Sequence, residues 1–251
     1  MPGIDPAAVP VSRVTWRPSY RLILLRYPVV GLYDAVADPA DLDTVFAIEA
    51  IGNPRLRDEI GELHLVPRDE RISGPGATPV MAAFTHLNPE GSRFSDGSFG
   101  VYYAAHSLAT AVAEVSHHRG VFLRRTREPA IELDHRLITA NVEADLHDLS
   151  APGTARPSRP AVDRASSPFA AALDPDDYSA SRRLGRALRE RGSSGIRYPS
   201  VRDASGECVG IFRPRALRHA KSSSHIALHW DGDRVSHWYE KAAPRAVDRR
   251  D

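Results

Sequence analysis

The stretch GSRFSDGSFGVYYAA, residues 91–105, joins a glycine-rich turn to the start of a β-strand. Glycine and Asp96 suit a chain reversal, but a turn has no need of Arg93 or of the adjacent rings of Tyr102 and Tyr103. Neighbouring side chains of a strand point to opposite faces of the sheet, so we expect one of the two rings to lie in the core. The additional polar groups predict a ligand site at this turn.

A helix is predicted directly after this strand, from the cap residue Ser107 to Gly120. Its apolar side chains fall on one face at about 100° per residue: Leu108, Ala111, Val112 and Val115. Glu114 lies at the border of that face. Because the turn, the strand and the helix are consecutive, one corner of the fold can bring Arg93, Tyr103 and Glu114 together.

These three groups have complementary chemistry. A guanidinium binds a diphosphate through two parallel hydrogen bonds, and a tyrosine ring stacks on a planar base. A carboxylate can hold a ribose hydroxyl or stabilise positive charge at an anomeric carbon. The combination predicts a dinucleotide ligand, although each residue taken alone could be an ordinary surface arginine, core tyrosine or solvated glutamate.

A second informative segment is GIRYPSVR, residues 195–202. Ser200 follows Pro199 at the predicted end of a strand, with Arg197 and Arg202 nearby, so its hydroxyl could bind an amide or a phosphate. The segment lacks the GxSxG elbow of nucleophilic hydrolases. Ser200 alone would also be explained by turn chemistry.

Composition excludes several classes of protein. The 251 residues contain 33 Lys and Arg against 32 Asp and Glu, so no overall field favours direct nucleic-acid binding. The single cysteine, Cys208, excludes an internal disulfide and fits a reducing cytoplasm. Neither a signal peptide nor a membrane span of about 18 apolar residues is recognisable, and we expect a soluble cytoplasmic protein.

The predicted organisation is a single domain at residues 16–240. We expect residues 1–15 to be disordered and residues 241–251 to form a charged tail. Residues 151–169 are rich in Pro, Ser and Arg and predict a long loop. Strands and helices do not alternate regularly and no GxGxxG or GxxxxGK[ST] occurs, which predicts an α+β fold. Strands are expected at 20–27, 79–87, 100–105, 130–149, 194–202, 206–214, 225–230 and 234–240, and further helices at 38–52 and 177–192.

The predicted helix at 107–120 also carries three side chains of the types that bind metal ions. Glu114, His117 and His118 have the i, i+3, i+4 spacing of ligands on one helical face. No second ligand-bearing segment is recognisable, so we expect no metal and assign the histidines to the helix C-terminus, where positive charge is favoured. The basic helix at 177–192 is expected to present a solvated face.

The quoted motifs, in this order, resemble the RES-domain toxins of bacterial toxin-antitoxin pairs, over roughly residues 20–239. Arg93 matches the family arginine, Tyr103 the tyrosine of the following strand, Glu114 the glutamate and Ser200 the late serine. Arg21, in SYRLI, matches a further arginine.

The resemblance implies a fold similar to ADP-ribosyltransferases, in which a mixed, split β-structure flanked by helices surrounds a cleft for NAD. It implies that NAD is a substrate whose nicotinamide-ribose bond is hydrolysed or phosphorolysed, which would arrest growth. Glu114, Arg93 and Tyr103 would be catalytic, and Arg21 and Ser200 would join Arg93 and Tyr103 in binding NAD. The alternatives are transfer of ADP-ribose to a protein acceptor and a non-enzymatic module that binds NAD or ADP-ribose. The implied partner is an antitoxin with a helix-turn-helix domain that blocks the cleft, in an oligomeric complex.

Overall fold

The structure is a computed structural model that describes residues 4–25, 31–52, 59–150 and 167–242. These residues form a seven-stranded mixed sheet in the order β1-β2-β5-β4-β3-β6-β7. The strands are β1 (Val11–Leu24), β2 (Tyr102–Ala105), β3 (Ile131–Asp148), β4 (Gly195–Pro199), β5 (Glu207–Ile211), β6 (Leu217–Trp230) and β7 (Val235–Lys241). The α-helices are α1 (Leu42–Gly52), α3 (Ala77–Thr85), α4 (Leu108–Thr126) and α5 (Ser179–Glu190), and 3-10 turns lie at Pro6–Ala8, Pro39–Asp41, Leu63–Leu65, Arg68–Glu70, Ala170–Leu173 and Pro214–Ala216. The predicted α+β class is confirmed.

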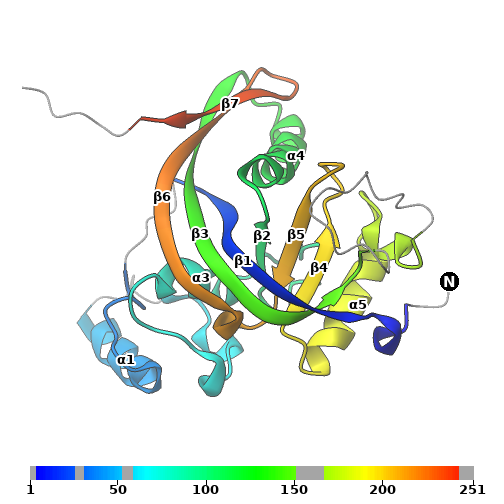
Figure 1. The fold of residues 1–251 in the computed structure, drawn as a ribbon. Helices are drawn as coiled ribbons and strands as arrows, with labels where there is room; N and C mark the ends of the chain where they lie inside the picture. Colours follow the sequence, from blue (N-terminus) through cyan, green and yellow to red (C-terminus); the bar gives the residue numbers. More distant parts are fainter. Residues whose placement is uncertain (1–3, 26–30, 53–58, 151–166, 243–251) are drawn as a thin grey trace, which may run out of the picture.

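The sheet has two parts that close into a ring. β1, β3 and β6 are long curved strands that run side by side, and β2, β5 and β4 are short strands beside them (Figure 1). An additional β1–β3 pairing closes the five strands β1, β2, β5, β4 and β3 on themselves. The two parts meet where β1 pairs with β2 at Tyr20↔Ala105, and where β3 runs parallel to β4 at His147↔Ile196.

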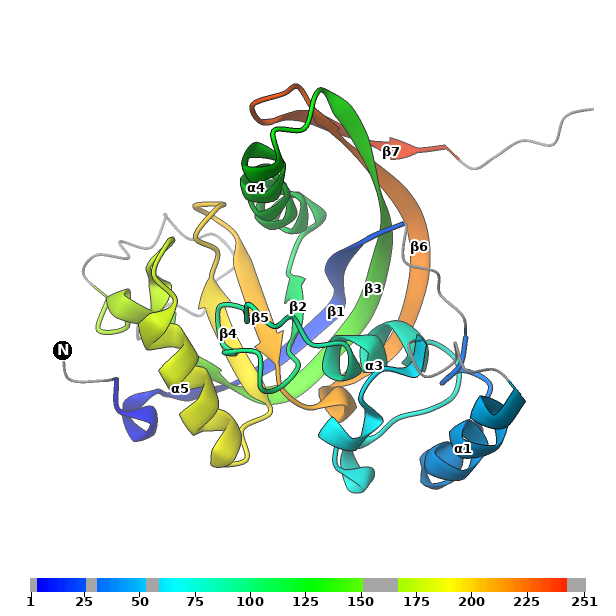
Figure 2. The ribbon, with the colours of Figure 1, turned by 180° about the vertical axis from the view of Figure 1, so that it is seen from behind.

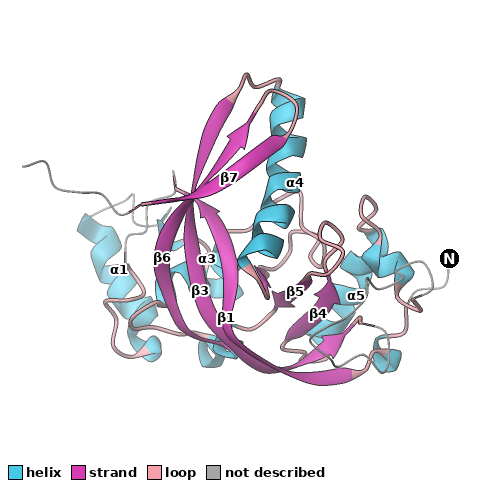
Figure 3. Ribbon diagram, turned by 45° about the horizontal axis from the view of Figure 1, so that its top comes forward, coloured by secondary structure: helices cyan, strands magenta, loops and turns pink. Residues whose placement is uncertain are grey.

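Helices cover both faces of this sheet. α4 rises beside the junction of the two parts (Figure 3) and buries Val112 with Leu137 and Leu228. α5 packs against β4, and α3 packs against β2 and β6 (Figure 2). α3 joins the apolar cluster that contains Tyr102 and Val209, which lies on the opposite side of β2 and β5 from α4.

Several predicted elements were wrong in type or extent; the strand predicted at 225–230, for example, begins earlier, at Leu217. Residues 79–87 were predicted as a strand, but Ala77–Thr85 is the helix α3, because a short apolar run that is buried on most sides has no clear period. α4 does not end at Gly120. That glycine faces the ring of Trp230 at a distance that a side-chain methyl would tolerate, and the helix continues to a left-handed cap at Arg127.

The ends of the domain also differ from the prediction. β1 begins at Val11, inside the segment that was expected to be disordered, because it pairs with β3 from Val11↔His147 onwards. Most of the predicted loop at 151–169 and of the tail at 241–251 lies outside the described residues. No helix among the described residues is long and apolar enough to cross a membrane.

Candidate functional site

One face of the short strands carries the candidate site. Tyr103 of β2 pairs with Gly210 of β5, and Cys208 of β5 pairs with both Ala105 of β2 and Tyr198 of β4. Directly paired residues of antiparallel strands share a face, so Tyr103, Cys208 and Tyr198 point to the same side. Ala111 of α4 packs in the same apolar cluster, which places α4 over this face.

Glu114 of α4 is bound by Ser200. The Ser200 Oγ donates a hydrogen bond to Glu114 Oε1 at 2.6 Å, and it accepts bonds from the backbone N–H groups of Arg202 at 3.1 Å and Asp203 at 3.0 Å. Ser200 directly follows the last residue of β4, Pro199, and is only 1% exposed. The hydroxyl therefore fixes the Glu114 carboxylate and the 200–203 turn together.

Two further side chains enclose this carboxylate. The Cys208 Sγ lies 3.8 Å from Glu114 Oε1. Burial, and then the nearby charge of Glu114, raise the pKa of the Cys208 thiol, and burial also raises the pKa of Tyr198. Both groups remain protonated at neutral pH.

Tyr103 organises the turn that carries Arg93. Its hydroxyl accepts a hydrogen bond from the Phe94 N–H at 2.9 Å and lies 2.8 Å from Ser92 Oγ. Burial raises the pKa of Tyr103 to about 12, so the phenol keeps its proton. Tyr102 is 0% exposed on the other side of the strand, which confirms that one of the two rings is in the core.

Arg93 is 7% exposed and contacts the segment that precedes α5. Its Nη1 donates to the carbonyl oxygen of Asp174 at 2.7 Å and to that of Ala172 at 3.5 Å, and its guanidinium carbon lies 4.4 Å from the centre of the Tyr178 ring. The positive charge of Arg93 also opposes the effect of burial on the pKa of Tyr103 and of Cys208. Phe94, the residue after Arg93, donates its N–H to the Tyr103 hydroxyl and packs against the Tyr198 ring, so Arg93 adjoins the group of side chains that surrounds Glu114.

Arg21 lies on the opposite face of the sheet. Tyr20 shares the face of Ala105, so the next residue, Arg21, points the other way. Its guanidinium lies 4.7 Å above the Tyr102 ring and its Nη1 donates to the Tyr103 carbonyl oxygen at 3.0 Å. Burial lowers the pKa of Arg21. Four of the five predicted site residues therefore gather on one face, and Arg21 supports β2 from behind.

His117 and His118 were expected at the C-terminal end of the helix. They lie inside it instead, because α4 continues beyond them to Thr126. Burial, and then the charge of Arg202, lower the pKa of His117 and of His118 to about 4. Both imidazoles are therefore neutral at neutral pH, and they supply no charge to the helix dipole. Within the residues that the structure describes, no group of three or more His, Cys, Asp or Glu side chains could hold a metal ion.

Sequence reasoning did not assign Tyr178, Tyr198, Cys208 or Arg202 to the site. The alternation along the two strands could have indicated Tyr198 and Cys208, since each lies on the face that Tyr103 occupies. No sequence signal places Tyr178 against Arg93, because this contact joins segments about eighty residues apart.

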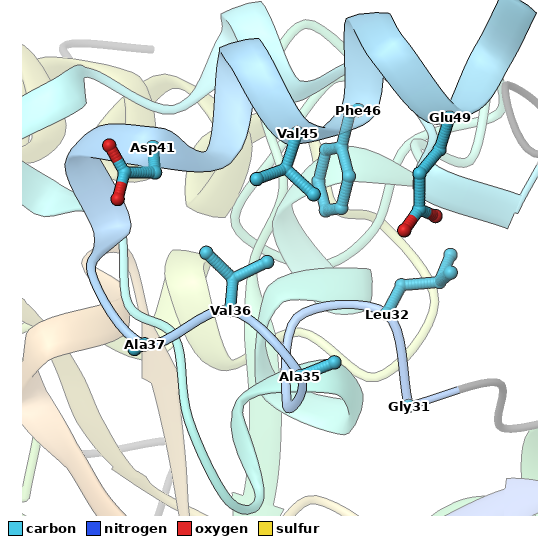
Figure 4. A pocket seen from close by; sticks show the side chains of 9 residues that line it. All are labelled: Gly31, Leu32, Ala35, Val36, Ala37, Asp41, Val45, Phe46 and Glu49. Atoms are coloured by element: carbon cyan, nitrogen blue, oxygen red, sulfur yellow. The ribbon is translucent and has the colours of Figure 1, made fainter.

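Two surface cavities lie away from these residues. One, of about 400 Å³, lies between α1 and residues 31–37 and has the carboxylates of Asp41 and Glu49 at its margin, which does not suit a phosphate (Figure 4). The other, of about 760 Å³, is lined by β1, β3 and β6 residues such as Tyr20 and Thr139. Neither is lined by Arg93, Tyr103 or Glu114.

Comparison with known proteins gives the family. Residues 68–231 match the family described as "RES domain". The chain belongs to the RES domain family. This match includes Arg93, Tyr103, Glu114 and Ser200, whereas Arg21 lies outside it.

One relative and one solved structure extend the comparison. The chain is 31% identical over 225 residues to "Uncharacterized protein y4oC" of Sinorhizobium fredii (strain NBRC 101917 / NGR234), which covers 88% of this chain and 86% of the relative. A likeness is also found to a chain in the crystal structure of the M. tuberculosis MbcT-MbcA toxin-antitoxin complex, with 14% identity, a TM-score of 0.46 and coverage of 87% and 89% of the two chains.

Proposed function

We propose that this RES domain protein is the toxin of a bacterial toxin-antitoxin pair and that it depletes NAD by breaking the nicotinamide-ribose bond. The observation that supports this most directly is the 2.6 Å hydrogen bond from Ser200 to Glu114, which fixes one carboxylate on the face that Arg93 and Tyr103 share. A fixed anion is what a reaction with a developing cation requires, because the charge is already in place when the cation forms.

In the proposed reaction the bond between the ribose C1′ and the nicotinamide nitrogen breaks, and its electron pair leaves with neutral nicotinamide. Glu114 stabilises the oxocarbenium-like C1′ and holds the ribose hydroxyls. A nucleophile then attacks C1′ and releases its proton to solvent. We propose water or phosphate as the nucleophile, with a protein side chain as the alternative.

The other residues have supporting roles in this proposal. Tyr103 fixes the 92–94 turn and offers its ring to the nicotinamide or its ribose. Arg93 binds the diphosphate. Ser200 acts through Glu114, since its hydroxyl is already hydrogen-bonded to the carboxylate and to two backbone N–H groups. Arg21 supports the diphosphate side of the site through the β2 backbone.

The cellular part of the proposal follows from the family resemblance. We propose a cytoplasmic protein whose partner is an antitoxin with a helix-turn-helix domain that covers the site in an oligomeric complex.

The test is nicotinamide release from NAD by the purified protein, with and without inorganic phosphate. Glu114→Gln should lower kcat by about two orders of magnitude or more and leave the fold intact, because the lost charge acts mainly in the transition state. Glu190→Gln, at an exposed glutamate of α5, is the matched control. Unchanged turnover in Glu114→Gln would exclude the role of Glu114.

A second arm separates the acceptors. Labelled NAD incubated with a cell lysate would label protein if ADP-ribose is transferred, and would release only small molecules if NAD is degraded. Binding of NAD without any nicotinamide release would favour the non-enzymatic module.

A further inference from the structure

Two arginines hold one short segment over the candidate site. The segment is Ala172–Tyr178, which runs from within the 3-10 turn at Ala170–Leu173 to the start of α5. Arg93 donates to the carbonyl oxygens of Ala172 and Asp174. Arg202 donates to the Pro175 carbonyl oxygen at 2.5 Å and lies 3.7 Å from the Asp176 carboxylate.

The hydrogen-bond partners that the segment offers to Arg93 and Arg202 are mainly neutral groups, although both arginines are cations. The hydrogen bonds and the ring contact of Arg93 in the described part of the chain are with neutral groups, namely two carbonyl oxygens and the Tyr178 ring. One anion also acts on Arg93 electrostatically, the Asp174 carboxylate, whose hydrogen bonds come from the N–H groups of Asp176 and Asp177. Asp176, the anion nearest to Arg202, is 85% exposed, and such an exposed pair contributes little. The Arg202 side chain is 16% exposed, and its buried Nε has no hydrogen-bond partner among the described residues. Hydrogen bonds from an arginine to an anion are about twice as strong as neutral ones, so an anionic ligand would be a better partner than the segment.

The spacing of the two arginines indicates the class of anion. Arg93 holds the carbonyl of Asp174 and Arg202 holds the carbonyl of the next residue, Pro175. Consecutive Cα atoms are about 3.8 Å apart, so the two guanidinium groups bind oxygen atoms that one residue of backbone separates. Two linked phosphates present oxygen atoms on the same scale.

We propose that Arg93 and Arg202 form a two-arginine site for a diphosphate, and that the carbonyl oxygens of segment Ala172–Tyr178 compete with the diphosphate for these two side chains. The inference rests on the proposed function, since the diphosphate would be that of NAD. It adds Arg202 to the binding residues, and it makes the segment a competitor that the ligand must displace.

The test is the binding of inorganic pyrophosphate to the full chain, measured by titration calorimetry. Arg202→Ala should weaken binding about tenfold or more, because it removes a largely buried charged donor. Asp176→Asn should tighten binding by about two- to fivefold, because it releases Arg202 from an exposed ion pair. Arg215→Ala, at an exposed arginine of the 3-10 turn Pro214–Ala216, is the control and should leave binding unchanged.

Arg202→Ala and Asp176→Asn are expected to shift the affinity for pyrophosphate in opposite directions. Asp176 is exposed, so its replacement keeps the proposal testable if Arg202→Ala does not fold. The proposal is overturned if pyrophosphate does not bind, if Arg202→Ala binds it as the parent does, or if Asp176→Asn binds it no more tightly. Nicotinamide release is measured on the same samples. If NAD is not cleaved but both shifts are found, the proposed function fails and the two-arginine site stands. If NAD is cleaved and neither shift is found, the reverse holds.

Discussion

Replacement of Ser200 by alanine tests whether this serine positions the candidate catalytic carboxylate. The substitution removes the 2.6 Å bond to Glu114 Oε1 and leaves the N–H groups of Arg202 and Asp203 without their acceptor, at a position that is 1% exposed. An unsatisfied buried donor costs about 1–3 kcal/mol. Because the 200–203 turn can relax, we expect the free energy of unfolding to fall by about 2–3 kcal/mol.

The same change should affect catalysis in a specific way. A loosely held Glu114 would lower kcat by about tenfold to a hundredfold, whereas KM for NAD should stay nearly constant, because Ser200 itself does not contact the ligand in this scheme. Urea unfolding and steady-state nicotinamide release give the two quantities. Ser205→Ala is the matched control, since this exposed serine lies in the same turn and bonds Asp203 at 3.2 Å. A Ser200→Ala protein in which KM rises and kcat is unchanged would show that the serine binds the ligand directly, and the positioning argument would be refuted.

Three further predictions concern stability. Burial lowers the pKa of His117 in the folded protein to about 4, below its usual 6.5. As the pH falls, the unfolded chain therefore binds the proton first, and the free energy of unfolding should decrease between about pH 6.5 and pH 4. In urea titrations His117→Asn should show a smaller decrease over this range. Gly120→Ala should raise the free energy of unfolding by up to about 1 kcal/mol, because α4 gains helix propensity and the new methyl would lie 3.5 Å from Trp230; no gain in thermal stability would contradict this. Gly185→Ala in α5 should lower the free energy of unfolding by about 2 kcal/mol or more, because the new methyl would clash with the Phe94 carbonyl oxygen. A variant with the parent melting temperature would show that α5 does not need to approach the Phe94 backbone so closely.

The part of the site that could be predicted from the sequence is local. Arg93, Tyr103 and Glu114 lie on a turn, a strand and a helix that follow one another, so their proximity depends on short connections and on the cap at Ser107, which the structure contains. Ser200 is brought to Glu114 by the pairing of β4 with β5. That long-range pairing could be inferred only through the family resemblance.

The side of the sheet on which Arg21 lies could not be predicted. The register of β1 against β3 shifts between Trp16 and Ser19, and this irregularity inverts the alternation of faces. Trp16, Ser19 and Arg21 therefore share a face, although an uninterrupted strand would place Trp16 opposite both. α3 could not be recognised either, since Val80, Met81 and Phe84 are buried in contact with both β-strands and loops, and no amphipathic period remains.

The thiol beside Glu114 gives this protein a built-in reporter. Cys208 is the only cysteine of the chain, it is 2% exposed, and burial keeps it protonated. A thiolate-selective reagent should therefore modify the folded protein slowly, and the rate of labelling would follow the opening of the region around the carboxylate. Protection of this one sulfur by a ligand or by a partner protein could be measured by mass spectrometry without any enzymatic assay.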